Sequence, residues 1–161
     1  MQVRSYKLRP LLPPRDNLFT ALAASRLALK NGDIVAVASK VVSIDEGRCV
    51  PTVDVLKESL IRREADFYLK PTRSKYRRIF TIARGMLVGS SGIDESNAKS
   101  HYILYPKDPF QSAKRLRRRL MKEHKIKKLG LVITDSTSLP FRRGAVGFAL
   151  AWAGFDPRAL P

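Results

Sequence analysis

The pattern of apolar and polar positions predicts a helix followed by a buried strand near the start of the chain. Residues 18–30 are rich in Ala and Leu, and their leucines fall on one side when the segment is placed on a helix. Asn31-Gly32 supplies a usual helix end. Residues 33–42 are apolar and β-branched over a short length, so they predict a buried strand.

The clearest helix signal in the chain begins at Asp108. This residue is a favourable N-cap, Pro109 suits the first helical position, and Gln111 completes the cap three residues later. Apolar residues then follow at helical spacing, namely Phe110, Ala113, Leu116 and Leu120. We therefore expect a helix over residues 108–124, with its apolar stripe facing a core.

The remaining segments predict short strands and one more helix. Residues 79–83 and 86–88 flank Arg84-Gly85 and predict a hairpin. Further strands are expected at 3–8, 48–50, 102–105 and 130–134, and a helix from Thr52 or Asp54 to Ala65. Residues 144–153 are small and apolar, which predicts either a strand or another buried segment. This mixture indicates an α+β (mixed α/β) fold, in which an antiparallel or mixed sheet has flanking helices. The chain, 1–161, is expected to form a single domain.

Composition narrows the classes of protein to which such a domain belongs. The 161 residues include 31 Lys and Arg against 14 Asp and Glu, a formal net charge of +17. No apolar run approaches the roughly 18 residues of a membrane span, and the first residues have no apolar signal core. Cys49 has no second cysteine with which to form a disulfide, so we expect a cytoplasmic protein. The charge favours an anionic partner, such as a phosphate, a polycarboxylate or a nucleic acid.

Two segments hold much of the positive charge. One contains Lys114, Arg115, Arg117, Arg118, Arg119, Lys122, Lys125, Lys127 and Lys128, and the other contains Lys70, Arg73, Lys75, Arg77 and Arg78. Both a solvated surface and an electrostatic footprint for nucleic acid fit these runs. No aromatic platform or zinc-ligand pattern interrupts them, so the two interpretations stay open.

Two acidic positions are candidates for metal ligands. Asp135 follows the apolar segment 129–134, and the end of a buried strand is where α/β folds bind ligands. Ser136 adds a hydroxyl beside it, and Asp94 lies in the polar, small-residue loop 90–97. Carboxylate and hydroxyl oxygens suit Mg²⁺ or Mn²⁺. The alternative for each aspartate is an ordinary turn in which it bonds its own backbone.

Three cationic residues are candidates for binding a phosphate or a carboxylate. Arg142 and Arg143 come soon after Asp135, and paired guanidinium groups can clamp such an anion with two hydrogen bonds. Lys40 is expected at the end of the predicted strand 33–42. A solvated arginine pair and a lysine that reaches to solvent are the alternatives.

Five groups of residues together resemble the coenzyme F420-0:L-glutamate ligase family. They are GDIV at 32–35 with SKVVS at 39–43 and EGR at 46–48; EADFYL at 64–69; GIDESN at 92–97; PKDP at 106–109; and ITDS at 133–136 with PFRRG at 140–144. The pattern is most similar to a bacterial branch named for folate-metabolism γ-glutamate ligases. Each motif is weak alone, but their order covers nearly the whole chain.

The resemblance implies a nucleotide- and metal-dependent amide ligase. In that family GTP or ATP converts a carboxylate into an acyl phosphate, which the amine of L-glutamate then attacks. The acceptor implied is coenzyme F420-0 or a folate-like carboxylate, and the family implies a homodimer. By motif, the expected ligands of Mg²⁺ or Mn²⁺ are Asp94, Asp135 and Ser136, the expected catalytic residues are Asp94, Asp135, Arg142 and Arg143, and the expected nucleotide contacts are Arg9, Pro10, Leu11, Leu12, Ser39, Lys40 and Asn97.

The chain departs from the family pattern in ways that bear on activity. Ile44, Ala145, Gly147 and Thr137 stand where relatives often carry Lys, Gln, Asp and His, respectively. The domain is also expected to lack the family's C-terminal part. The alternative function is therefore a truncated, non-catalytic ligase-like domain that binds RNA or another polyanion through its basic surface.

Overall fold

A computed structural model describes residues 2–70, 79–95, 100–138 and 143–158. Its helices are α1 (Leu18–Ala24), α2 (Ser39–Asp45), α3 (Lys57–Glu64) and α4 (Pro109–Glu123), with the 3-10 turn η1 (Ser90–Gly92). Its strands are β1 (Ile34–Ala38), β2 (Cys49–Pro51), β3 (Phe67–Tyr68), β4 (Phe80–Ala83), β5 (Met86–Gly89), β6 (His101–Ile103), β7 (Gly130–Thr137) and β8 (Val146–Ala153). The predicted mixed α+β class is confirmed.

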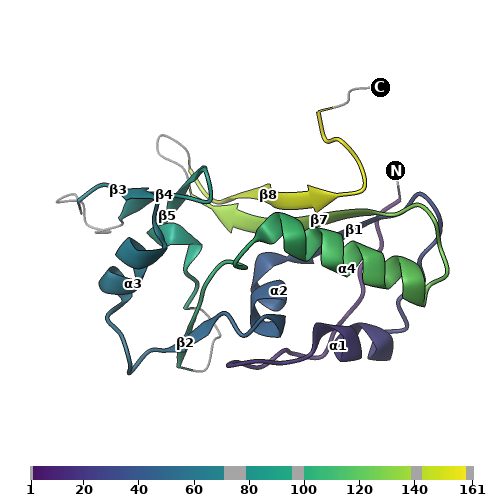
Figure 1. Cartoon of the computed structure of the whole chain (residues 1–161), viewed down its shortest axis with the longest axis horizontal. Coiled ribbons are helices and arrows are strands. Elements are labelled where there is room, and N and C mark those ends of the chain that lie inside the picture. Colours follow the sequence, from purple (N-terminus) through teal and green to yellow (C-terminus); the bar gives the residue numbers. More distant parts are fainter. Residues whose placement is uncertain (1, 71–78, 96–99, 139–142, 159–161) are drawn as a thin grey trace.

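The main sheet has the strand order β1-β7-β8. β1 runs parallel to β7, with Ile34 opposite Gly130 and Ala38 opposite Thr134, whereas β8 runs antiparallel to β7. Helices α1, α2 and α4 lie on one side of this sheet (Figure 1). A parallel pair needs a long crossover, and here the crossover contains the whole middle of the chain.

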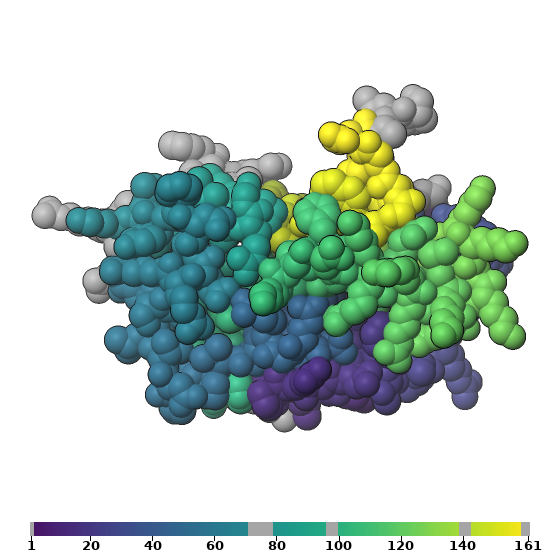
Figure 2. Space-filling model, in the orientation of Figure 1, coloured from purple at the N-terminus to yellow at the C-terminus, as the bar shows by residue number. Residues whose placement is uncertain are grey.

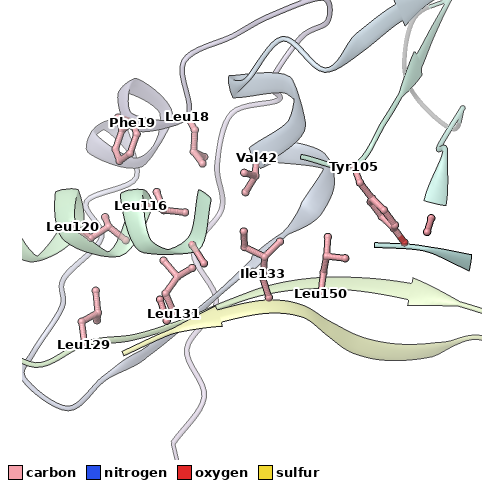
Figure 3. Packing of buried hydrophobic residues seen from close by; sticks show 14 of the residues in the cluster. Leu18, Phe19, Val42, Tyr105, Leu116, Leu120, Leu129, Leu131, Ile133 and Leu150 are labelled. Atoms are coloured by element: carbon pink, nitrogen blue, oxygen red, sulfur yellow. The ribbon is translucent and has the colours of Figure 1, made fainter. Parts of the chain in front are cut away.

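Burial of the apolar face of α4 against the sheet forms the larger core. Leu116 and Leu120 of the helix meet Leu131 and Ile133 of β7, and all four side chains are buried (Figure 3). The helix begins where the sequence predicts it, because the Asp108 side chain accepts a hydrogen bond from the backbone N–H of Gln111 at 3.0 Å. The predicted helix is confirmed, and Ala113, Leu116 and Leu120 of its apolar stripe are buried, whereas Phe110 is 42% exposed, so its expected place in the core is wrong.

Two smaller sheets form the other part of the molecule (Figure 1). β2 pairs with β6, and β3, β4 and β5 form an antiparallel sheet in which the predicted hairpin turns at Arg84-Gly85. A second apolar cluster joins these strands to α3, and its buried members are Leu60, Ile61, Ile79, Ile93, Tyr102 and Leu104. Among the helices that the structure describes, none has the length and hydropathy needed to cross a membrane.

Several predicted elements are wrong in extent. Residues 3–8 form no strand. The helix predicted over 18–30 ends at Ala24, because Ser25 bonds the carbonyl of Leu22 and Arg26 adopts a positive φ of 53°.

The strand predicted over 33–42 also ends early, at Ala38, where α2 starts without a linker. Val42 and Ile44 are β-branched and favour a strand locally, but both are buried on α2, so packing overrides their propensity. The following helix starts at Lys57, later than the predicted Thr52 or Asp54. The other predicted strands differ from the observed ones by one to three residues at their ends.

Candidate active site at the carboxyl ends of two parallel strands

The parallel register of β1 and β7 brings two predicted site segments together. Ala38, the last residue of β1, lies opposite Thr134, so Ser39 and Lys40 lie beside Asp135 in the fold. The sequence predicts Lys40 at the end of a strand, but the structure shows that it is the second residue of α2. Asp135 lies within β7, which continues two residues beyond it. The site is therefore at the edge of the sheet where α/β folds commonly bind ligands.

Tyr105 holds Asp135 by a direct hydrogen bond. Its hydroxyl donates to Oδ2 of Asp135 at 2.6 Å, and its side chain lies at the border of the main core (Figure 3). Burial, together with the neighbouring carboxylate, raises the pKa of Tyr105 far above its usual value. The phenol therefore remains a donor at every physiological pH and fixes one oxygen of Asp135, while Oδ1 can still accept from a ligand.

The loop that carries Asp94 packs directly on the same tyrosine. Gly92 has a positive φ of 69°, and a Cβ added to it would lie 1.9 Å from Cζ of Tyr105. Two residues later, the backbone of Asp94 exchanges two hydrogen bonds with Ile103, at 2.9 and 2.8 Å. The ring of Tyr105 therefore connects the Asp94 loop to Asp135, and only a glycine lets the loop approach so closely.

Lys40 places a positive charge at Asp94. Its Nζ lies 2.5 Å from Oδ2 of Asp94, and both side chains are about one third exposed, at 34% and 36%. Such a partly exposed ion pair contributes little to stability. Its importance is the position of the charge, because an ammonium at this edge of the sheet can interact with an anionic ligand bound there.

Three charged residues, Arg48, Glu64 and Arg84, fix the backbone at Tyr105. Arg48 bonds the carbonyl of Tyr105 through Nε at 3.0 Å and Glu64 through NH2 at 2.6 Å. Arg84 also reaches Glu64, at 3.3 Å. Arg48 thus ties the backbone at Tyr105 to α3 and to the β4–β5 turn, so the donor to Asp135 sits on a rigid support.

The predicted nucleotide-binding segment at the N-terminus is fixed close to this site. Arg9 forms two hydrogen bonds with Asp16, each 2.7 Å long, and the backbone N–H of Leu12 also bonds Asp16. These contacts, with the one to Arg9 the strongest, hold the pKa of Asp16 well below its usual value. Leu11 packs against a cluster that contains Ile103, the backbone partner of Asp94.

The other predicted site residues either lie away from the two aspartates or fall outside the described residues. Ser39 is buried at the start of α2. Ser136 is exposed and follows Asp135 in the strand, so its side chain leaves the opposite face of the sheet. Arg143 is exposed in the connection before β8, and the described part of the chain gives it no ion pair with either aspartate. Asn97 and Arg142 lie outside the described residues, as do four members of the predicted basic segment 70–78.

The two aspartates fit the donor set of a magnesium or manganese ion that is shared with a ligand. Within the described ranges, no group of three or more His, Cys, Asp or Glu could hold a metal ion by itself. Mg²⁺ is often held by only one or two carboxylates, with waters and substrate phosphates completing its coordination. Asp94 and Asp135 match that case, whereas they do not match a structural metal site with a full set of protein ligands.

Tyr105 is the site residue that sequence reasoning missed. The sequence predicts a strand over residues 102–105, whereas β6 ends at Ile103. One signal was available, because a tyrosine in the apolar run before Pro106 must bury its hydroxyl beside an acceptor. The sequence alone does not show that the acceptor is Asp135, thirty residues away.

Comparisons with known proteins agree with the resemblance seen in the motifs. The family model described as F420-0:Gamma-glutamyl ligase matches residues 9–159. A Coenzyme F420:L-glutamate ligase of Methanopyrus kandleri is 31% identical and aligns with 96% of this chain and 67% of its own. The Coenzyme F420:L-glutamate ligases of Archaeoglobus fulgidus and Halobacterium salinarum are each 33% identical to this chain and align with 90% of it. The alignments cover 64% and 63% of the length of these two relatives, respectively. The chain thus spans about two thirds of the length of these relatives.

Proposed function

Because the chain belongs to the F420-0:gamma-glutamyl ligase family, we propose that it ligates L-glutamate to a carboxylate acceptor, coenzyme F420-0 or a folate-like compound, at the expense of GTP or ATP. The observation that carries this proposal is the arrangement around Tyr105. Its hydroxyl bonds Asp135, and its ring supports the loop of Asp94, which pairs with Lys40. Two carboxylates and one cation at a strand edge suit a metal–nucleotide complex.

The proposed reaction has two steps that balance. An oxygen of the acceptor carboxylate attacks the γ-phosphorus, and the bond to the nucleoside diphosphate breaks, which leaves an acyl phosphate. The amine of glutamate then attacks the acyl carbon and loses a proton, and inorganic phosphate leaves with the electrons of its C–O bond. The product is an amide. Catalysis of phosphoryl transfer of this kind depends mostly on positioning and on stabilisation of charge.

The residues of the chain have separate parts in this proposal. Asp94 and Asp135 would hold Mg²⁺ or Mn²⁺, which when bound shields the phosphates and polarises the transferred group. Lys40 would supply positive charge to the phosphates from its place beside Asp94. Tyr105 is a positioning residue, because it fixes one oxygen of Asp135 and leaves the other for the ligand.

Substitution of each aspartate by asparagine tests the proposal without disturbing the fold. Asp135→Asn keeps an acceptor for Tyr105, and Asp94→Asn removes the negative charge from a partly exposed ion pair. We expect both variants to lose Mn²⁺-dependent GTP or ATP binding, measured by calorimetry, and incorporation of labelled glutamate. Asp54→Asn is the matched control, because Asp54 is exposed between β2 and α3.

Tyr105→Phe tests the positioning role separately. Loss of a hydrogen-bond partner of a metal ligand typically lowers metal affinity about 10- to 100-fold. We therefore expect the Mn²⁺ affinity of Tyr105→Phe to fall within that range, while its preference between GTP and ATP stays unchanged. If the wild-type protein binds neither GTP nor ATP with Mn²⁺ present, the ligase proposal is wrong for this chain. If Asp54→Asn loses as much activity as the two site variants, the assignment of the site is wrong.

A further inference from the structure

The structure divides the basic residues of α4 and of the segment after it into two groups. Two of them pair with acids, since Arg115 pairs with Asp45 and Glu46, and Arg119 pairs with Glu123. Two others bond backbone carbonyls, Arg117 that of Leu129 and Arg118 that of Lys114. Apart from Arg117, six cations in the part of the chain that the structure describes have no acidic partner within ion-pair distance: Lys114, Arg118, Lys122, Lys125, Lys127 and Lys128. All six side chains are exposed.

Three of the cations without an acidic partner form a single row on the helix. Lys114, Arg118 and Lys122 are spaced four residues apart, so their side chains are neighbours on the surface. Like charges at this spacing destabilise a helix. In the neighbouring row, which contains Arg115 and Arg119, Glu123 pairs with Arg119 and reduces this repulsion. The helix dipole accounts for Lys122 in the last turn, but it favours neither Lys114 nor Arg118. The row therefore offers three neighbouring cations to an anionic ligand.

An exposed aromatic ring continues the same row. Phe110 lies four residues before Lys114, remains 42% exposed, and meets the ring of Trp152 edge to face at 4.9 Å. The sequence showed no aromatic platform because Phe110 precedes the basic run and Trp152 comes from β8. An aromatic face beside a line of cations is the arrangement with which proteins stack a base and follow a phosphate backbone.

A groove borders the row along the first half of α4. Its volume is about 550 Å³, and its lining includes Gln111, Arg115 and Arg118. The two acids of its lining are already engaged, since Glu46 bonds Arg115 and Asp108 caps the helix. The groove therefore does not cancel the positive charge of the row. Side chains from α4 and the lysine-rich segment after it project from the surface in Figure 2.

We propose that this surface, Phe110 with Lys114, Arg118 and Lys122 and the lysines that follow, binds single-stranded RNA. A membrane surface fits it less well, because the apolar side of α4 is buried in the core and cannot insert into lipid. None of its residues belongs to the proposed ligase machinery.

The experiment measures binding of a fluorescent 20-nucleotide RNA to the full chain by anisotropy, over a range of salt concentrations. For Lys114→Gln/Arg118→Gln/Lys122→Gln we expect affinity to fall at least about tenfold at low salt. The slope of log K against log salt should become shallower by about 2, because each phosphate contact with a single strand contributes about 0.7. The control, Lys7→Gln/Arg15→Gln/Lys30→Gln, removes the same charge from exposed positions elsewhere and should change affinity no more than about twofold.

A second variant separates RNA from other polyanions. Phe110→Leu should weaken RNA binding by roughly fivefold or more and leave binding of inorganic polyphosphate unchanged, since only RNA has bases to stack. The proposal is overturned if both triple variants lose equal affinity, if Phe110→Leu binds RNA as the wild type does, or if vesicles rich in anionic phospholipid compete RNA away.

Discussion

Gly92→Ala is the sharpest test of the connection between the two aspartates. The added Cβ would lie 1.9, 2.1 and 2.5 Å from three ring carbons of Tyr105, and that ring is only 4% exposed. To restore an ordinary carbon–carbon contact, the ring or the loop must move by roughly 1.6 Å. A shift of that size breaks the 2.6 Å hydrogen bond from Tyr105 to Asp135, because hydrogen bonds of this kind end near about 3 Å.

The magnitude follows from two costs. Alanine in the left-handed conformation of Gly92 costs about 1–2 kcal/mol, and loss of a hydrogen bond to a charged group costs about 1.5–3 kcal/mol. The free energy of unfolding should fall by about 2.5–5 kcal/mol in total, which for a chain of this size lowers Tm by roughly 5–20 °C. Gly85→Ala is a matched control, since Gly85 has a φ of 73° but no atom within 4 Å of an added Cβ. Only the backbone cost of about 1–2 kcal/mol applies to it.

Thermal unfolding followed by circular dichroism measures both variants. A double variant, Gly92→Ala/Tyr105→Leu, should lose less stability than the sum of its single changes, because the smaller side chain leaves room for the new methyl group. Equal losses for Gly92→Ala and Gly85→Ala would refute the reasoning, because the ring would then make no difference. Strict additivity in the double variant would refute it as well.

Three further predictions concern stability and reactivity. The hydrogen bond from Arg9 lowers the pKa of Asp16, so the carboxylate stabilises the fold above about pH 4 and this contribution is lost as the pH falls further. Between pH 5 and pH 2.5, the Tm of Asp16→Asn should therefore decline less than the Tm of the wild type. Parallel curves of Tm against pH would contradict this. Burial raises the pKa of the Cys49 thiol, so it should react with a disulfide reagent at pH 8 about tenfold more slowly than after unfolding in guanidinium. Leu120→Ala should lower the free energy of unfolding by about 3–5 kcal/mol, against less than about 0.5 kcal/mol for Lys114→Ala, as measured by urea titration.

Helix caps and turn residues predicted the elements that depend mainly on contacts between residues close in the sequence. The cap at Asp108, with Pro109 and the spacing of its leucines, placed α4 correctly because cap and amphipathic stripe agree. The turn at Arg84-Gly85 placed the β4–β5 hairpin for the same reason. Residues 39–45 show the opposite case, because β-branched residues favour a strand there and burial on α2 decides the outcome.

The site was predictable in its residue types but not in its connections. The sequence identified Asp94, Asp135 and Lys40 as candidates, and the structure shows that Lys40 pairs with Asp94. It could not identify Tyr105, because the bond to Asp135 and the contact with Gly92 both depend on tertiary packing. Likewise, the contact of Phe110 with Trp152 forms only once α4 is folded against β8.

The parallel pairing of β1 with β7 has a consequence for the order in which the protein folds. Ile34 pairs with Gly130, so nearly a hundred residues must be made and looped out before the pair can close. Contacts between such distant segments are slow to form because the entropy of closing the loop is lost before they contribute. Helix α4 and the β4–β5 hairpin depend on local contacts and can form early. The edge of the sheet that carries Lys40 and Asp135 must come together late, so we expect nucleotide binding to appear only in the last phase of refolding.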